Sequence, residues 1–112
     1  MSTYRVLLRM QVVPGQEELF ERAWLDGAQI IAREPANVAQ SLSRADDEAG
    51  VYYIVSDWVD EPAFRAYEGS ERHRQHRARL HPYRSAGSMT TMALMATLAG
   101  HGQPSVDLTP VR

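Results

Sequence analysis

The chain has 112 residues, a formal net charge of −2 at pH 7 and a hydrophobic fraction of 44%. This length fits one domain, and a charge so near zero argues against a nucleic acid or an anionic membrane as partner. The chain contains no cysteine, which excludes disulfides, thiol catalysis and cysteine-bound metals. No apolar run approaches the roughly 20 residues of a membrane span, and no signal-peptide pattern is present, so we expect a cytoplasmic protein.

The first element expected is a strand over Tyr4–Val13, in which apolar and more polar residues alternate. Pro14 and Gly15 end this strand. A helix follows from Gln16 to about Arg33, and its first turn carries two glutamates, which the helix dipole favours there. An apolar stripe at helical spacing runs along it: Phe20, Ala23, Trp24, Gly27 and Ile31.

Two further strands, Val38–Arg44 and Val51–Trp58, flank a polar turn, and this close spacing predicts an antiparallel hairpin. The second of them is rich in β-branched and aromatic residues, and both of its faces are largely apolar. We therefore expect it to be a central strand that is covered on both sides. Asp57 lies on the face opposite to Trp58, so we expect it to pair with an arginine across a dimer interface.

The next helix is expected to be broken into two pieces, residues 61–68 and residues 71–80. Asp60 is a suitable N-cap for the first piece, and Ser70 is one for the second, because short oxygen-bearing side chains accept hydrogen bonds from free amides at helix starts. Gly69 weakens the helix between them.

A loop over residues 81–87 and a last strand over Ser88–Leu98 complete the predicted elements. Three methionines of this strand are expected to be adaptable core residues: Met89, Met92 and Met95. Residues 1–98 are therefore expected to form one domain, followed by a tail over residues 99–112.

The order of elements, β-α-β-β-α-β, predicts an α+β fold of the ferredoxin-like type. Right-handed connections give a four-stranded antiparallel sheet with both helices on one face. The other face carries a good share of the apolar side chains of the strands, and a patch of that size is larger than soluble monomers usually expose. We therefore predict a homodimer in which two chains pack sheet to sheet around a two-fold axis.

The second piece of the broken helix carries the main group of side chains that could take part in catalysis. His73, His76 and Arg77 share one helix face at spacings of three and four residues. A neutral imidazole can take a proton from a phenol or a ring carbon, and a neighbouring arginine can hold the resulting oxyanion. The alternative is an ordinary solvated, arginine-rich helix. A metal site would need a further ligand, and we expect none.

Three stretches carry a family resemblance: V-V-P-G-Q-E-E-L-F at residues 12–20, Y-Y-I-V-S-D-W at residues 52–58 and D-E-P-A-F-R-A-Y-E-G-S-E-R-H at residues 60–73. They resemble the antibiotic biosynthesis monooxygenase superfamily, whose members are dimeric ferredoxin-like α/β barrels. The resemblance implies an oxygenase that needs no cofactor, neither flavin nor metal. Such an enzyme oxidises a phenolic or anthrone-type aromatic polyketide intermediate to a quinone with O₂.

In the oxygenases of this family the pocket lies between the helices and the sheet, and the resemblance places Trp58 in its wall. Tyr52, Ile54 and Ser56 share the strand face of Trp58 and are expected to line the pocket with it. Ile54 stands where several of these oxygenases have a catalytic asparagine. This departure favours two alternative functions, a polyketide cyclase or a non-catalytic dimer that binds an aromatic metabolite.

The resemblance and the helix pattern together suggest a role for each remaining candidate. We expect His73 to act as the base and Arg77 to hold the substrate anion, with Tyr67 and His76 in contact with the substrate. Tyr67 alternatively packs on Phe64 alone. Haem-degrading relatives have a tryptophan and a ligand histidine where this chain has Tyr67 and Arg77, which argues against haem degradation.

Overall fold

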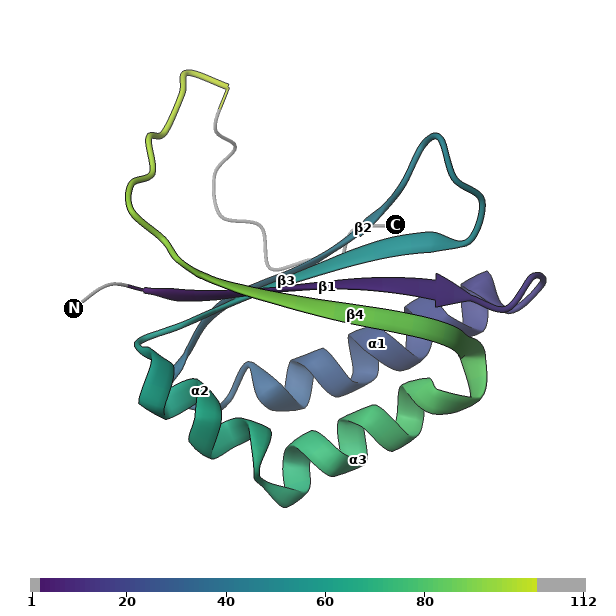
Figure 1. Ribbon diagram of the computed structural model, residues 1–112, viewed down its shortest axis with the longest axis horizontal. Helices are drawn as coiled ribbons and strands as arrows, with labels where there is room; N and C mark the ends of the chain where they lie inside the picture. The colour runs from purple at the N-terminus through teal and green to yellow at the C-terminus, as the bar shows by residue number, and fades with distance from the viewer. Residues whose placement is uncertain (1–2, 103–112) are drawn as a thin grey trace.

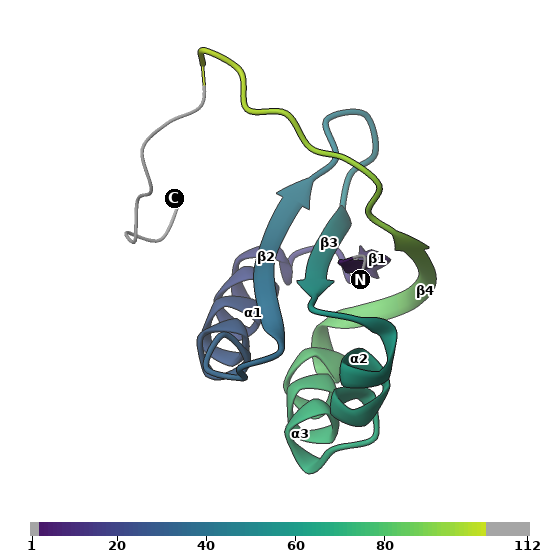
Figure 2. The same ribbon diagram turned by 90° about the vertical axis from the view of Figure 1, so that its left-hand side faces the viewer.

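The computed structural model describes residues 3–102. Its elements are β1 (Tyr4–Val12), α1 (Glu17–Ile31), β2 (Asn37–Arg44), β3 (Val51–Trp58), α2 (Glu61–Glu68), α3 (Glu71–Leu80), the 3₁₀ turn η1 (His81–Tyr83) and β4 (Arg84–Ala93). The strands form one antiparallel sheet in the order β2-β3-β1-β4, and all the helices cover the same face (Figure 1 and Figure 2). The predicted ferredoxin-like fold and the central position of β3 are confirmed.

Two clusters of buried apolar side chains join the helices to the sheet. The larger one consists of Met10, Val12, Phe20, Trp24, Ala28, Tyr52, Ile54 and Leu80. The smaller one consists of Val6, Ile31, Trp58 and Phe64. The predicted apolar stripe of α1 is confirmed, because Phe20, Trp24 and Ile31 are buried in these clusters. Within residues 3–102, no helix is both long enough and apolar enough to cross a membrane.

The predicted break between α2 and α3 is confirmed, and each helix has its own cap. Asp60 Oδ1 accepts a hydrogen bond from the backbone N–H of Ala63 at 2.8 Å. Ser70 Oγ accepts one from the backbone N–H of His73 at 3.3 Å. These bonds satisfy amides that have no partner within their own helix. The break turns the chain, so that α2 and α3 meet at an angle beneath the sheet (Figure 1).

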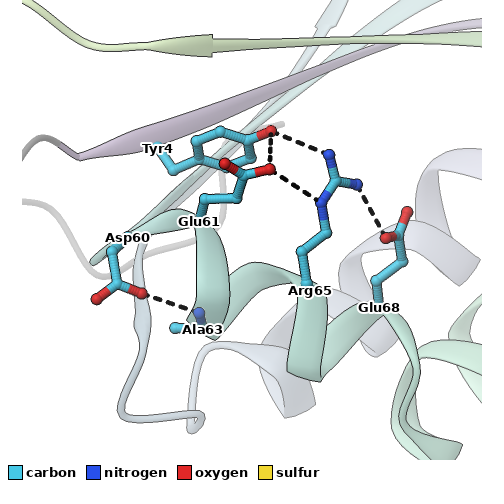
Figure 3. A network of polar contacts seen from close by, with 6 residues as sticks. All are labelled: Tyr4, Asp60, Glu61, Ala63, Arg65 and Glu68. Atoms are coloured by element: carbon cyan, nitrogen blue, oxygen red, sulfur yellow. Dashed lines mark hydrogen bonds and ion pairs between the residues drawn. The ribbon is translucent and has the colours of Figure 1, made fainter.

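A polar network ties α2 to the start of β1 (Figure 3). The hydroxyl of Tyr4 donates to Glu61 Oε2 at 3.5 Å, and Arg65 donates to both of these oxygens, at 3.1 and 3.4 Å. Arg65 Nη1 also donates to Glu68 Oε1 at 3.0 Å. These groups are exposed, so the network adds little stability. Its geometric effect is to orient Glu68 at the end of α2.

The predicted bounds of the last strand, Ser88–Leu98, are wrong at both ends, because β4 runs over Arg84–Ala93. The residues predicted as a loop, 81–87, form η1 and the start of β4 instead. β4 begins to pair with Gln11 and Val12 as soon as the turn is complete. The bounds of β4 are set by its backbone pairing with β1. The alternation of apolar and polar residues along the sequence does not show where this pairing begins and ends.

The three methionines predicted as core residues are exposed. Met89 and Met92 lie on β4 with 46% and 36% of their surface exposed, and Met95 follows the strand at 84%. β4 is an edge strand with a neighbour on one side only, so its side chains are covered less than those of β1 or β3. Of the predicted tail, residues 99–102 contain no helix or strand, and residues 103–112 lie outside the described residues.

The sheet face that points away from the helices is more polar than predicted. Arg5 donates from Nε and Nη2 to the two carboxylate oxygens of Asp57, at 2.8 and 2.9 Å. The prediction that Asp57 pairs across a dimer interface is therefore wrong, because its arginine stands opposite it on the neighbouring strand. Arg9, on the same face, pairs with Glu48 of the β2–β3 turn at 3.0 Å. Charge pairs thus border the apolar part of this face.

Candidate active site

A cavity of about 310 Å³ lies between the inner face of the sheet and the helices. Its floor is formed by apolar side chains of β1 and β3, such as Val6, Leu8 and Ile54, and its roof by residues of α2 and α3, such as Phe64 and Leu80. This volume is at the small end of the range of ligand pockets, about 300–1,000 Å³. An apolar hollow of this size suits a flat ligand of a few rings.

The structure brings all the predicted site residues except Tyr52 to this cavity. Trp58, Ile54 and Ser56 line it from β3. Tyr67 lines it from α2, and His73, His76 and Arg77 line it from α3. The three α3 residues face the cavity together because spacings of three and four residues put them on one side of the helix.

Tyr52 does not line the cavity, although it lies on the predicted strand face. Only 1% of its surface is exposed, and its ring packs on Phe20 of α1 with centroids 5.0 Å apart. Its hydroxyl donates to Glu21, also on α1. Burial, followed by the effect of Glu21, raises the pKa of Tyr52 to about 12. Tyr52 therefore holds α1 against the sheet.

Trp58 and Tyr67 form an aromatic wall. Their rings stack with centroids 4.6 Å apart and planes 24° apart. The indole Nε1 of Trp58 donates to Ser56 Oγ at 3.0 Å, so the one polar atom of this buried side chain has a partner. Burial raises the pKa of Tyr67, with a smaller contribution from Glu34, so its hydroxyl stays protonated and can donate a hydrogen bond.

His73 lies at the edge of this wall. Its ring meets the Tyr67 ring edge-on, with centroids 5.2 Å apart and planes 81° apart. Burial lowers the pKa of His73, and the positive charge of Arg77 lowers it further. The imidazole is therefore neutral at pH 7 and has a lone pair available to accept a proton.

His76 is held more tightly, between α3 and α1. Burial lowers its pKa to about 4, with smaller contributions from Arg79 and His73. Its Nδ1 is buried without a hydrogen-bond partner. A Cβ atom added to Gly27 of α1 would lie 2.0 Å from this Nδ1. The absence of a side chain at position 27 therefore makes room for the His76 ring.

Two charged residues that sequence analysis missed also line the cavity, Glu68 and Arg84. The charge of Glu68 acts on His73, partly opposing the fall in the pKa of that histidine. Arg84 stands in a segment that was predicted to be a loop. The end of α2 was predicted correctly, but no pattern in the sequence shows that Glu68 faces the cavity. Arg84 was missed because the start of β4 was predicted four residues too late. Within residues 3–102, no three His, Asp or Glu side chains are grouped so that they could hold a metal ion.

Comparisons with known proteins agree with this fold. The family model described as antibiotic biosynthesis monooxygenase matches residues 3–79. SnoaB from Streptomyces nogalater, a cofactor-independent oxygenase, superposes with a TM-score of 0.77 at 23% sequence identity. The superposition covers 89% of this chain and 100% of SnoaB. A search among curated protein sequences finds no match.

Two other solved structures, each described as a candidate antibiotic biosynthesis monooxygenase, are equally similar in shape. The one from Caulobacter crescentus has a TM-score of 0.76 and 23% identity, covering 85% of this chain and 92% of that one. The one from Nitrosomonas europaea has a TM-score of 0.76 and 13% identity, covering 84% and 91%. Likeness at such low identity establishes a shared fold, while chemistry has to be argued from the site.

Proposed function

Because the chain belongs to the antibiotic biosynthesis monooxygenase family, we propose that it is a cofactor-independent oxygenase that acts on a phenolic or anthrone-type aromatic polyketide intermediate. The reaction converts a ring CH₂ to a carbonyl and thereby yields a quinone. One oxygen atom of O₂ enters the substrate, and the other leaves as water with the two hydrogens of the CH₂ group. Atoms and electrons balance without an added reductant.

One observation carries this proposal: the imidazole of His73 stands at the edge of the aromatic wall formed by Trp58 and Tyr67. The rings of the substrate bind against Trp58 and Tyr67, whose flat faces suit a polycyclic phenol. His73, neutral because its pKa is lowered, takes a proton from the substrate. The guanidinium of Arg77, which lines the same cavity, stabilises the resulting anion. The anion is electron-rich and transfers an electron directly to O₂.

A second candidate function rests on Ile54. This side chain is 5% exposed and forms part of the cavity wall, so that part of the wall offers no amide to bind oxygen or an oxyanion. A polyketide cyclase needs a shaped apolar cavity and an acid–base group, but no reaction with O₂. A dimer that only binds an aromatic metabolite needs the cavity alone. Oxygen consumption separates the oxygenase from both alternatives.

We also propose that the protein is a homodimer that packs through the outer face of its sheet. Leu7 and Val55 are partly buried apolar residues that stand opposite each other at the middle of this face. The Arg5–Asp57 and Arg9–Glu48 pairs stand on either side of them. An apolar centre with a charged border is the usual arrangement of a protein interface.

The proposed activity is tested by oxygen uptake. Chelator-treated protein is mixed with 1,8-dihydroxy-9-anthrone, and both oxygen consumption and quinone absorbance are followed. We expect both to exceed the spontaneous rate, and we expect His73→Ala and Arg77→Ala to remove most of the excess. Uptake at the spontaneous rate despite tight ligand binding would favour the cyclase or the binding protein. Full activity in both variants would refute the assigned roles.

A further inference from the structure

One polar side chain of the cavity wall has no part in the reaction proposed above. Gln40 of β2 is half-buried and is the only carboxamide among the described residues that line the cavity. It stands directly opposite Ser56 of β3, and the side chains of such a pair share one face of the sheet. Gln40 and Ser56 therefore place a polar pair within the mostly apolar floor of the cavity.

A contact with α1 fixes the orientation of this carboxamide. Gln40 Nε2 donates to the backbone carbonyl of Ala28 at 3.0 Å. A carbonyl oxygen only accepts, so the nitrogen has to face α1 and Oε1 has to lie on the other side of the group. The same carbonyl accepts the backbone N–H of Ala32 at 2.8 Å. The carboxamide is thus anchored to a helix, which reduces the side-chain entropy that is lost when a ligand binds.

Oε1 of Gln40 is an acceptor without a donor. Within residues 3–102, the hydrogen bond of this side chain is the one that its nitrogen donates to α1. In the same part of the chain, the only fully buried side-chain nitrogen or oxygen without a partner is His76 Nδ1, so Oε1 is not sealed off. It can therefore accept a hydrogen bond from a ligand hydroxyl without the loss of a bond inside the protein.

Ser56 supplies the complementary group. Its Oγ accepts a hydrogen bond from Nε1 of Trp58 at 3.0 Å, and its own hydrogen remains free to be donated. The Cβ atoms of directly opposite residues are about 4.5–5.5 Å apart, which lets one ligand hydroxyl reach both side chains. Such a hydroxyl donates to Gln40 Oε1 and accepts from the Ser56 hydroxyl.

From this arrangement we infer that Gln40 is a specificity residue, which with Ser56 binds a hydroxyl group of the substrate and so fixes its orientation relative to His73. Gln40 is anchored on the side of β2 and α1, whereas His73 belongs to α3 on the other side (Figure 2). Stacking on the aromatic wall alone leaves a flat ligand free to turn in its own plane. A directional contact on the opposite side removes this freedom. The inference deepens the proposed function and rests on it for the aromatic ligand.

The test uses two stable ligands of the same shape, 2-hydroxyanthraquinone and 2-methylanthraquinone. Dissociation constants are measured by tryptophan fluorescence at a pH below the pKa of the ligand hydroxyl, so that this group can donate. We expect the wild-type protein to bind the hydroxy ligand more tightly. Gln40→Leu is expected to lower this preference about tenfold, the effect of roughly one hydrogen bond, without weakening the binding of the methyl ligand.

Gln11→Leu is the matched control. Gln11 also donates from Nε2 to a backbone carbonyl, that of Ala49 at 3.3 Å, but it does not line the cavity. Its replacement should leave the preference unchanged. Equal affinity of the wild-type protein for the two ligands, or no binding of either, would overturn the inference, and so would a preference that persists in Gln40→Leu. A merely structural role of Gln40 would weaken the binding of both ligands alike.

A kinetic comparison tests the orientation itself. The hydroxyls of 1,8-dihydroxy-9-anthrone are bonded to its own carbonyl, whereas 1,3,8-trihydroxy-9-anthrone has a further, free hydroxyl. Gln40→Leu should therefore lower kcat/KM more for the second anthrone, and an equal decrease for both would contradict the inference. Because the two quinone ligands are already oxidised, a preference that depends on Gln40 without oxygen uptake on either anthrone would refute the oxygenase and leave the binding role of Gln40 standing.

Discussion

The indole of Trp58 and the ring of Tyr67 lie 4.6 Å apart, centroid to centroid, across the boundary between β3 and α2. The Tyr67 ring in turn meets His73 at 5.2 Å. The buried end of a central strand is thereby connected through one aromatic ring to a titratable group of α3. An aromatic ligand that packs against this pair would lie beside the imidazole of His73.

The first prediction concerns this stack. Tyr67→Ala removes one of its two rings, and we expect the affinity for 1,8-dihydroxyanthraquinone to fall about tenfold, the effect of roughly 1 kcal/mol of aromatic pairing plus lost apolar contact. Tyr67→Phe preserves the ring and should retain most of the affinity, so the difference between the two variants separates stacking from the hydroxyl. Fluorescence titration measures both. An unchanged dissociation constant in Tyr67→Ala would rule out the aromatic wall as the binding surface.

Period-two alternation was sufficient to predict the inner-face positions of β3. Ile54, Ser56 and Trp58 lie where that rule puts them, because side chains of a strand alternate between its faces. Tyr52 obeys the same rule, but α1 covers it. The alternation of residues along a strand does not show which part of the sheet a helix will cover. Arg84 was missed for a related reason. Its place in the cavity wall depends on the pairing of β4 with β1, a long-range contact.

The second prediction is a pH dependence of the proposed reaction. Only neutral His73 can accept a proton, so the rate should rise with pH and level off once the imidazole has lost its charge. The folded protein lowers the pKa of His73 below 6.5, so the midpoint of this rise should lie below that value. The measurement is kcat/KM for the anthrone as a function of pH.

Arg77→Gln provides a second readout of the same site. Arg77 contributes to the lowered pKa of His73, so its removal should move the midpoint to higher pH in addition to reducing the rate. A purely structural role of Arg77 would lower the rate without moving the profile. A wild-type rate that does not fall as the pH is lowered from 6.5 to the limit of the folded protein's stability would argue that His73 is not the base.

The third prediction concerns assembly. We expect the protein to sediment as a dimer, and we expect Val55→Glu to convert it to a monomer, because a charge at the middle of an apolar contact is left without a partner. Gln75→Glu, an equal change of charge at an exposed position of α3, is the control and should remain dimeric. Analytical ultracentrifugation distinguishes the two species. A wild-type monomer at concentrations well above those of the assay would contradict the proposed interface.

The fourth prediction tests the close contact between α1 and α3. A Cβ atom at position 27 would lie 2.0 Å from Nδ1 and 2.5 Å from Cε1 of His76, so the ring must move in Gly27→Ala. We expect the free energy of unfolding to fall by about 1–3 kcal/mol, the usual cost of overpacking. In a His76→Ala background the imidazole ring that clashes with the added Cβ atom is absent. There the same substitution should raise stability by about 0.5–1 kcal/mol, because alanine is favoured over glycine within a helix.

Urea unfolding of the four proteins of this cycle measures the coupling between the two positions directly. Gly69→Ala is the control, since a Cβ atom there would come no closer than 3.7 Å to a neighbour. The moved imidazole should also alter the cavity wall, so Gly27→Ala is expected to bind the anthraquinone more weakly than Gly69→Ala does. An effect of the same sign and size in both backgrounds would mean that α1 and α3 do not meet through His76. The sign reversal is the decisive result, because general loosening of α1 would not produce it.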